Sequence, residues 1–351
     1  MSVKVFKLNN GDEVQRFVLP VPSSGSELAD SDLPSPAAVV PGMIYKGHVT
    51  LFSGAPKAGK STVIRDILCR IHAAFATYDP VASMMPDRFI RPERTLVVSE
   101  ESGWAWQEFA EGLDGDSRDK DWFKIMHRGH GRVAPGGSDE LVLWVDAVIE
   151  MCKALDIGLV IIDPVTRFGA ITCENDNSEV LRALMAFERI ASETGAALVL
   201  LHHTTKGGNE PRGCSAWQQQ PDVILSLRAL GEREEIEQAE GVQKHRVRIL
   251  TGKGRFPEIE DSIVCHCDEE GRYHHLPGVF DRFVSKAEYD SETILTAMRA
   301  NRMMVKGSDI KNATKLAQGP FGRAMRLLVA KNRVIKSGTT IDTEYVLADT
   351  D

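Results

Sequence analysis

Apolar segments of strand length alternate with helical patterns between about Pro41 and Pro277. The apolar segments that read as strands are HVTLFSG (48–54), RTLVVSE (94–100), WFKIMHR (122–128), IGLVIID (157–163), AALVLLHH (196–203), DVILSLRA (222–229) and HRVRILTGK (245–253). Between two of them, residues 177–195 show helical periodicity and end at a glycine. Strands that are apolar on both faces and alternate with helices predict an α/β fold, in which helices cover both sides of a mostly parallel central sheet.

The pattern differs on either side of this region. Residues Pro20–Pro36 are rich in Pro, Ser and Gly, a composition typical of linkers. After residue 277 the chain shows three short helical segments and then a hairpin pattern, which predicts a small winged-helix-like domain. We therefore expect an N-terminal segment with its linker at 1–40, the α/β domain at 41–277 and the winged-helix-like domain at 283–351.

A glycine-rich segment, GAPKAGKST, separates the first strand from an amphipathic helical pattern. It fits G-x-x-x-x-G-K-[ST], the Walker A pattern, in which the glycines let the backbone curl around phosphate oxygens, Lys60 neutralises phosphate charge and Ser61 offers a hydroxyl to Mg²⁺. The alternative is an ordinary glycine-rich turn. The segment predicts ATP and Mg²⁺ as cofactors, bound by Gly54, Ala55, Pro56, Lys57, Ala58, Gly59, Lys60, Ser61 and Thr62.

Carboxylates end two of the other predicted strands. LVIID ends in Asp163, which suits a buried strand that delivers one carboxylate to Mg²⁺ at the edge of the sheet. TLVVS is followed by Glu100 and Glu101, which suit a general base for the attacking water, with Glu100 preferred. The alternative for these two is a pair of surface acids at the start of a helix.

The strand at 196–203 ends in two histidines, at a place where packing alone would favour Val or Leu. We expect His203 to contact the γ-phosphate and to transmit its loss to the loop that follows, and His202 to be structural. The alternative is that both are residues of the site's rim.

Five segments occur in the order seen in one known family: GAPKAGKST, VVSEES, LVIIDPVTRF, LVLLHHTTKG and RGCSAW. The chain, from about Pro41 to Glu258, resembles the RecA-like P-loop ATPases similar to RepA-type replicative helicases. This resemblance implies a RecA fold, ATP hydrolysis at the interfaces of a homo-oligomer that is usually a hexameric ring, Glu100 as the catalytic base and His203 as the γ-phosphate sensor. It also implies that Arg212 is an arginine-finger candidate for a neighbour's ATP.

The later segment LTGKGRF resembles the K-x-R segment of ring helicases. This resemblance implies that Lys253 and Arg255 lie at the subunit interface, where a cation reaching the γ-phosphate would stabilise charge in the transition state. The alternative is surface charge at the end of a strand.

Charge is distributed unevenly along the chain. The formal net charge of −8 argues against a wholly basic nucleic-acid coat protein. Residues 306–336, in contrast, hold eight basic residues and one acid, which is a phosphate-binding pattern, although a solvated helix face can look similar. The expected recognition helix, Pro320–Lys331, carries Arg323, Arg326 and Lys331 for duplex DNA, and Lys206 is the expected contact for single-stranded DNA in the ring.

The six cysteines are scattered and suggest no disulfide framework. CHCDEEGRYHHL, at 265–276, raises the alternative of a zinc site at Cys265, Cys267, His274 and His275, but its spacing favours a turn between two short strands. The chain shows neither a signal-peptide pattern nor an apolar run long enough to span a bilayer, so we expect a cytoplasmic protein without a membrane partner.

The leading interpretation is an ATP-hydrolysing, DNA-directed motor of the replicative-helicase kind. One alternative is a RecA- or RadA-like recombination or repair ATPase, which would form filaments. Another is an ATP-switched winged-helix regulator that binds one duplex sequence and turns ATP over slowly. The sequence leaves this choice open.

Overall fold

The computed structural model divides the chain into two compact units, Met1–Ala37 and Ala38–Asp351. It describes residues 2–7, 13–18, 36–77, 80–84, 88–113, 115, 120–131, 133–204, 210–230, 242–256, 258–259, 262–276, 286–301, 306–330, 333–337 and 344–348. The first unit contains an antiparallel hairpin of β1 (Ser2–Lys7) and β2 (Glu13–Val18). The expected linker lies outside the described residues except for its last proline.

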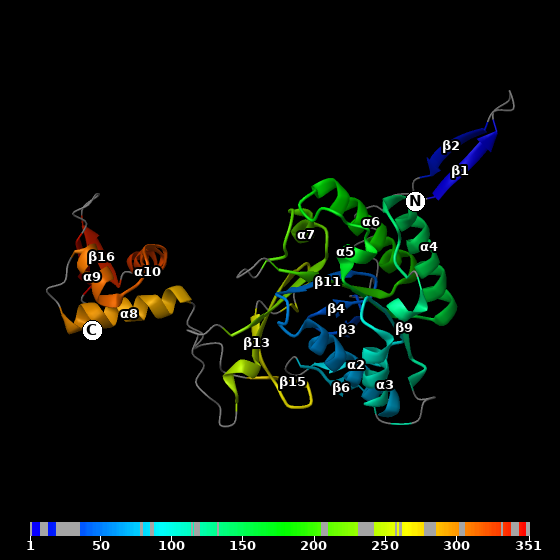
Figure 1. Cartoon of the computed structure of the whole chain (residues 1–351). Coiled ribbons are helices and arrows are strands. Elements are labelled where there is room, and N and C mark those ends of the chain that lie inside the picture. The colour runs from blue at the N-terminus through cyan, green and yellow to red at the C-terminus, as the bar shows by residue number, and fades with distance from the viewer. Residues whose placement is uncertain are drawn as a thin grey trace, which may run out of the picture. The chain divides into compact units, whose positions relative to one another are not determined.

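A nine-stranded sheet forms the centre of the second unit (Figure 1). In spatial order its strands are β15 (Tyr273–His275), β14 (Ser262–Cys267), β13 (Val247–Gly254), β12 (Val223–Ala229), β5 (Val49–Gly54), β11 (Ala197–His203), β10 (Leu159–Asp163), β8 (Thr95–Ser99) and β9 (Phe123–His127). The six strands from β12 to β9 are parallel, and β13, β14 and β15 extend the sheet as antiparallel strands. The mostly parallel sheet expected from the sequence is therefore confirmed, with all seven proposed strands present.

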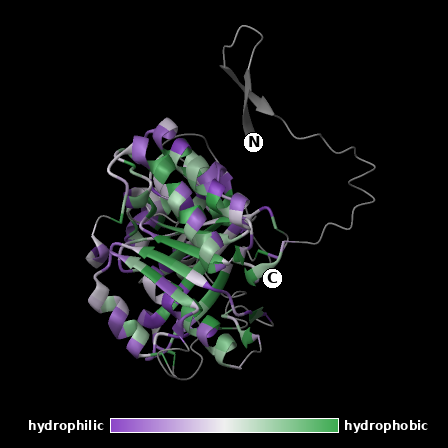
Figure 2. Ribbon diagram, turned by 90° about the vertical axis from the view of Figure 1, so that its right-hand side faces the viewer, coloured by the Kyte–Doolittle hydropathy of each residue, from purple (hydrophilic) through white to green (hydrophobic). Residues whose placement is uncertain are grey.

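Helices cover both faces of this sheet, as the doubly apolar strands predict. One face packs against α2 (Lys60–Thr77) and α3 (Gly103–Glu111), and the other against α4 (Ser138–Leu155) and α6 (Asn177–Thr194) (Figure 1). Figure 2 shows the consequence, hydrophobic strands enclosed by helices with hydrophilic outer faces. Helix α6 begins after its N-cap Asp176 and ends at Gly195, whose φ of 72° is left-handed.

Smaller elements join these layers. They are β3 (Ala38–Val40) with β4 (Ile44–Tyr45), β6 (Val81–Ala82) with β7 (Phe89–Ile90), the helices α5 (Val165–Phe168) and α7 (Ala216–Gln219), and the 3₁₀ turns η2 (Arg128–His130) and η3 (Lys244–Arg246). Within the described part of the chain, no helix is long and apolar enough to cross a membrane.

The segment CHCDEEGRYHHL folds as the turn between β14 and β15. Gly271 takes a φ of 81° in this turn, Cys265 is buried in the core and His274 bonds Asp268 at 2.7 Å. Across the described residues, no group of three or more His, Cys, Asp or Glu side chains is arranged to hold a metal ion.

The C-terminal part of the second unit has its own hydrophobic cluster. Its elements are α8 (Lys286–Ala300), α9 (Gly307–Thr314), α10 (Gln318–Ala330), β16 (Val334–Ser337) and β17 (Glu344–Leu347), the two strands being antiparallel. They occur where the sequence pattern predicts three helices and a hairpin. Ile294, Ile310, Met325 and Leu328 are among the residues that fill the cluster.

Candidate phosphate-binding and catalytic site

Residues far apart in sequence meet at one edge of the sheet, because neighbouring parallel strands end there together. His203 at the end of β11 pairs with Gly54 at the end of β5, and Asp163 at the end of β10 pairs with Ser99 at the end of β8. Glu100 follows directly, and its N–H donates to the Asp163 carbonyl at 3.1 Å. Ligands of open α/β sheets bind at this carboxyl edge.

The phosphate loop between β5 and α2 has a conformation that requires its glycines. Gly59 has a φ of 100°, and a Cβ there would lie 2.6 Å from the Tyr273 hydroxyl. A Cβ on Gly54 would lie 2.8 Å from the Leu227 carbonyl oxygen. Helix α2 starts at Lys60, so its unpaired N–H groups and the positive end of its dipole face the loop. This loop is therefore shaped to bind an anion.

Lys60 holds its ammonium inside this loop. The Nζ atom donates to the carbonyl oxygens of Gly54 at 2.7 Å and Ala55 at 3.3 Å, and the residue is only 9% exposed. Burial lowers the pKa of Lys60, while the nearby Asp163 opposes this shift. An ammonium bonded to two carbonyl oxygens and to the neutral ring nitrogen of His203, 3.3 Å away, is well placed to be paired with phosphate oxygens.

Asp163 is a half-buried carboxylate at the end of β10. Burial and the neighbouring Glu101 and Glu100 raise its pKa to about 6, although Lys60 acts in the opposite direction. A divalent cation would stabilise a carboxyl group with a raised pKa, because the cation favours its charged form. Ser61, half-buried in the first turn of α2, offers the hydroxyl. These two oxygen donors fit Mg²⁺, which prefers one or two protein ligands alongside phosphate and water.

Both candidates for the general base are paired with arginines of the same chain. Glu100 contacts Arg167 at 3.2 Å, and Glu101 contacts Arg65 on α2 at 3.1 Å. Glu100 also lines a cavity of about 320 Å³ together with Arg167, and none of residues 54–62 of the phosphate loop lines it. Arg167 belongs to the segment LVIIDPVTRF, but no sequence pattern assigns it a role at this site.

The two histidines at the end of β11 have separate surroundings. His203 Nδ1 lies 3.3 Å from Lys60 Nζ, and because an ammonium only donates, the ring proton belongs on Nε2. Burial, then Lys60 and Arg212, lower the pKa of His203, so it is neutral at pH 7. His202 is buried, stacks on Trp217 at 4.1 Å and donates from Nε2 to the Arg212 carbonyl at 2.7 Å, which fits the structural role expected for it.

The three candidate interface cations lie at different edges of the sheet. Arg212 follows β11 at the carboxyl edge, where its side chain pairs with Glu174. Lys253 and Arg255 lie at the opposite, amino edge, because β13 runs antiparallel to β12, and Arg255 pairs there with Asp222 at 3.0 Å. Lys206 and Lys331, two of the expected DNA contacts, lie outside the described residues.

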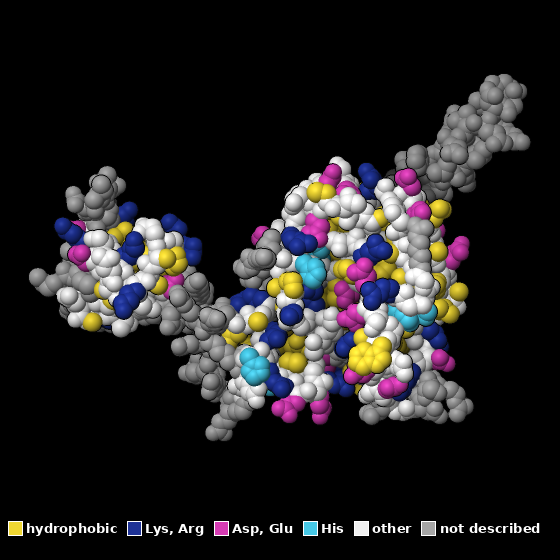
Figure 3. Space-filling view, in the orientation of Figure 1, with side chains coloured by type: hydrophobic (Ala, Val, Ile, Leu, Met, Phe, Trp, Pro, Cys, Tyr) yellow, Lys and Arg dark blue, Asp and Glu magenta, His cyan; other side chains and the backbone are white. Residues whose placement is uncertain are grey.

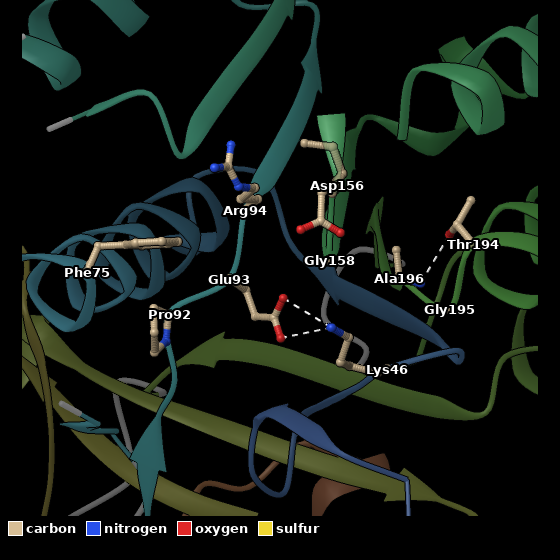
Figure 4. A pocket seen from close by; sticks show the side chains of 11 residues that line it. Lys46, Phe75, Pro92, Glu93, Arg94, Asp156, Gly158, Thr194, Gly195 and Ala196 are labelled. Carbon is tan, nitrogen blue, oxygen red and sulfur yellow. Dashed lines mark hydrogen bonds and ion pairs between the residues drawn. The ribbon is translucent and has the colours of Figure 1, made fainter. Parts of the chain in front are cut away.

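A second cavity, of about 290 Å³, also lies at the amino edge (Figure 4). Lys46 and Glu93 face each other across it, with Nζ 2.9 Å from Oε1. Gly158 lies beside them, and a Cβ there would displace the Glu93 carboxylate from its present position. The two charges neutralise each other, and the cavity is on the side of the sheet away from the phosphate loop.

The fold and the site together define a RecA-like P-loop ATPase. A family model described as an AAA domain (AAA_25) matches residues 18–209, more than half of the chain, and the chain belongs to this family. The match includes the phosphate loop, Glu100, Asp163 and His203, and it ends before Arg212, Lys253 and Arg255. Members of P-loop ATPase families generally use ATP with Mg²⁺. A search of curated proteins found no match to the chain.

Glu100→Gln is expected to retain ATP binding and to lower hydrolysis by at least about 100-fold, because the amide keeps the shape of the side chain and cannot accept a proton from water. Binding of a fluorescent ATP analogue and phosphate release would be measured on the same preparation. Glu101→Gln is the matched control, since it alters the neighbouring carboxylate and its pair with Arg65. If Glu100→Gln hydrolyses ATP at the parental rate and Glu101→Gln does not, Glu101 is the general base.

The affinity for Mg²⁺-ATP is expected to fall as the pH drops through about 6, the raised pKa of Asp163. Above this pH the carboxylate is charged and available to the cation. Below it, proton competition should weaken binding by up to about tenfold per pH unit. The dissociation constant for Mg²⁺-ATP would be measured between pH 5 and 8 for the parent and for Asp163→Asn. The variant lacks the Asp163 carboxyl group and serves to record the pH dependence that comes from protonation of ATP. Equal slopes in the two proteins would contradict the role of Asp163.

Proposed function

We propose that this ATPase is a DNA-directed motor of the replicative-helicase kind, which hydrolyses ATP at the interfaces of a ring of identical subunits. Lys60 and the loop N–H groups hold the phosphates, Glu100 takes a proton from the attacking water, and Nε2–H of His203 faces the γ-phosphate. When bound, ATP and Mg²⁺ supply the transferred phosphoryl group and neutralising positive charge.

The observation that carries the proposal of a site shared between subunits is the position of Arg255. Arg255 N–H donates to the Asp222 carbonyl, and Asp222 N–H donates to the carbonyl of Val49, where β5 begins. The phosphate loop starts at the other end of β5, five residues later, or about 17 Å away at about 3.3 Å per residue. An arginine side chain cannot span this distance along its own subunit. With 66% of its side chain exposed, Arg255 can instead reach an ATP bound by a neighbour.

We expect two loops to face single-stranded DNA in the ring, RFGAITCENDNS (167–178) after β10 and TTKGGNEPRG (204–213) after β11, and Glu174 joins them. Its carboxylate pairs with Arg212, and its carbonyl oxygen accepts from Cys214 N–H at 2.9 Å and Trp217 Nε1–H at 3.3 Å. Arg212 N–H in turn donates to the carbonyl of His203 at 2.9 Å. A change at the γ-phosphate that moves His203 can therefore reach both the loop after β10 and the loop after β11, which is what a DNA motor needs.

A second DNA contact is proposed at α10, read as the recognition helix of a winged-helix domain. Arg323 and Arg326 are exposed on this helix, and Figure 3 shows Lys and Arg side chains over this part of the chain. Gly319 and Gly322 lie beside them; leaving the helix's own backbone aside, a Cβ on Gly319 would meet the Arg323 guanidinium at 3.7 Å, and one on Gly322 would meet that of Arg326 at 3.9 Å, among the described residues. The helix surface is thus open and basic, as backbone contacts to duplex DNA require.

The recombinase and regulator alternatives share the same ATP site. Images of filaments would favour the first, and tight binding to a single duplex sequence with slow ATP turnover would favour the second. Arg255 could contact a neighbouring subunit in a ring or in a filament, so images of the particles are needed to distinguish these two assemblies.

Mixing two inactive variants tests the shared site. Lys60→Ala and Arg255→Ala should each be nearly inactive alone, since loss of an arginine finger typically costs about 10³-fold or more in rate. A mixture should regain activity, because some interfaces then combine an intact phosphate loop with an intact Arg255. ATPase rates would be measured with and without single-stranded DNA, after labelled subunits confirm exchange.

The same mixture made with Arg212→Ala in place of Arg255→Ala identifies which arginine acts across the interface. Rescue with Arg212→Ala alone would assign the role to Arg212. Confirmed exchange without rescue in either mixture would count against a site shared between subunits.

The double variant Arg323→Ala, Arg326→Ala should bind duplex DNA more weakly and keep its basal ATPase rate. Two lost phosphate contacts should reduce the slope of log affinity against log salt by about 2. Lys153→Ala, Arg182→Ala is the matched control, because it removes two exposed cations from α4 and α6. If both double variants keep the parental slope, α10 does not contact the DNA backbone.

A further inference from the structure

Two side chains from the antiparallel half of the sheet reach the phosphate loop. Arg248 of β13 donates from Nε to the Ala58 carbonyl oxygen at 2.7 Å. The hydroxyl of Tyr273, at the start of β15, lies 2.6 Å from the position that a Cβ of Gly59 would take. Neither residue belongs to a nucleotide-binding motif, and both lie beyond the residues matched by the family model.

The reversal of strand direction explains why they meet the loop. Because β13 runs antiparallel to β12, its beginning lies at the carboxyl edge of the parallel strands. Leu250 is level with Leu227, which pairs with Gly54, and Arg248 lies two residues further toward the loop. Strand β14 reverses again, so β15 also begins at this edge with Tyr273.

Arg248 is held firmly in this position. Its NH1 donates to the carbonyl oxygens of His245 at 2.8 Å and Val247 at 2.9 Å, while Nε is directed at Ala58. The guanidinium group is planar, so two bonds at one end fix the direction of the third. The Ala58 carbonyl therefore has a fixed, charged donor.

Tyr273 is held to helix α2 from both sides of its backbone. Its N–H donates to the carboxylate of Asp66 at 3.3 Å, and its carbonyl accepts from Arg70 at 2.7 Å. Asp66 is 1% exposed and is itself paired with Arg70. Burial raises the pKa of Tyr273, so the hydroxyl beneath Gly59 stays protonated. The β14–β15 hairpin is thus anchored to the helix that starts at the phosphate loop.

We propose that Arg248 is a positioning residue of the ATP site, which sets the orientation of the peptide between Ala58 and Gly59. In a trans peptide the C=O and the following N–H point in opposite directions. Holding the Ala58 carbonyl outward on Arg248 therefore directs the Gly59 N–H into the loop, toward the phosphates. Gly59 is free to adopt other backbone angles, and without this bond the peptide can rotate and withdraw its donor.

This inference rests on the assignment of the loop as the ATP site, and it is tested in the full chain with Arg248→Met, which keeps an apolar stem and removes the donors. The dissociation constant for ATP should rise about tenfold, the range for losing a hydrogen bond to a charged group. The rate constant at saturating ATP should change by less than about threefold. Arg248→Lys, which retains one charged donor, should recover part of the affinity.

Inorganic triphosphate is the second probe, used as a competitor of a fluorescent ATP analogue. Its affinity should fall by the same factor as that of ATP, because the Gly59 N–H contacts phosphate. Arg246→Ala is the matched control, since Arg246 pairs with the exposed Glu269 at 3.7 Å from the adjacent turn. The unfolding temperature is recorded for every variant.

The outcomes separate the inference from the assignment of the site. Parental affinity in Arg248→Met, alongside lost binding in Lys60→Ala, would overturn the role of Arg248 and leave the ATP site intact. Weaker binding of ATP with unchanged binding of triphosphate would also overturn it. If Arg248→Met does not fold, Arg248→Lys becomes the test. It should bind triphosphate about threefold more weakly than the parent. Binding as tight as in the parent would contradict the inference. Absence of ATP and triphosphate binding in the parent would reject the site itself.

Discussion

Alignment of the ends of four parallel strands is the constraint on which the site depends. The pairs His203 with Gly54 and Asp163 with Ser99 bring one ammonium and three carboxylates to a single edge. Burial first, and then the neighbouring Glu101 and Glu100, raise the pKa of Asp163, while Arg167 and Arg65 pair with Glu100 and Glu101. These three cations, the ammonium and the two arginines, equal the three carboxylates in formal charge, yet the pKa of Asp163 stays raised at about 6, so a divalent cation beside it would stabilise its charged form.

Local pattern was sufficient to predict the parallel strands, their helices and the acids and histidines that end them. Those residues lie at the carboxyl ends of strands, and in a parallel sheet all these ends lie at the same edge, whichever strands are neighbours. Arg248 and Tyr273 could not be found in this way. Their contact with the loop depends on β13 and β15 running in the reverse direction. For Arg248 and Ala58 this joins residues 190 positions apart, and it leaves no periodic signal in the sequence.

The pairing of side chains was also beyond sequence reasoning. Arg212, Arg167 and Arg255 each have an acidic partner, Glu174, Glu100 and Asp222, that is remote or unremarkable in the sequence. Whether Cys265 could bind zinc depends on whether its strand directs the thiol to solvent or to the core, and the sequence alone does not show this. The burial of Cys265, which raises its pKa to about 12, is a property of the assembled sheet.

The ion pair between Arg255 and Asp222 has a consequence for the proposed contact of Arg255 with a neighbouring subunit. With most of the arginine side chain in water, solvent screening leaves the pair worth at most about 1 kcal/mol. Asp222 meanwhile keeps a second bond, from Val49 N–H to its other oxygen, and so stays in place when the arginine leaves. Asp222 thus holds the Arg255 side chain in one orientation, which favours its encounter with the phosphates of a neighbour's ATP. Because the pair is weak, it costs little energy to break when Arg255 moves to those phosphates.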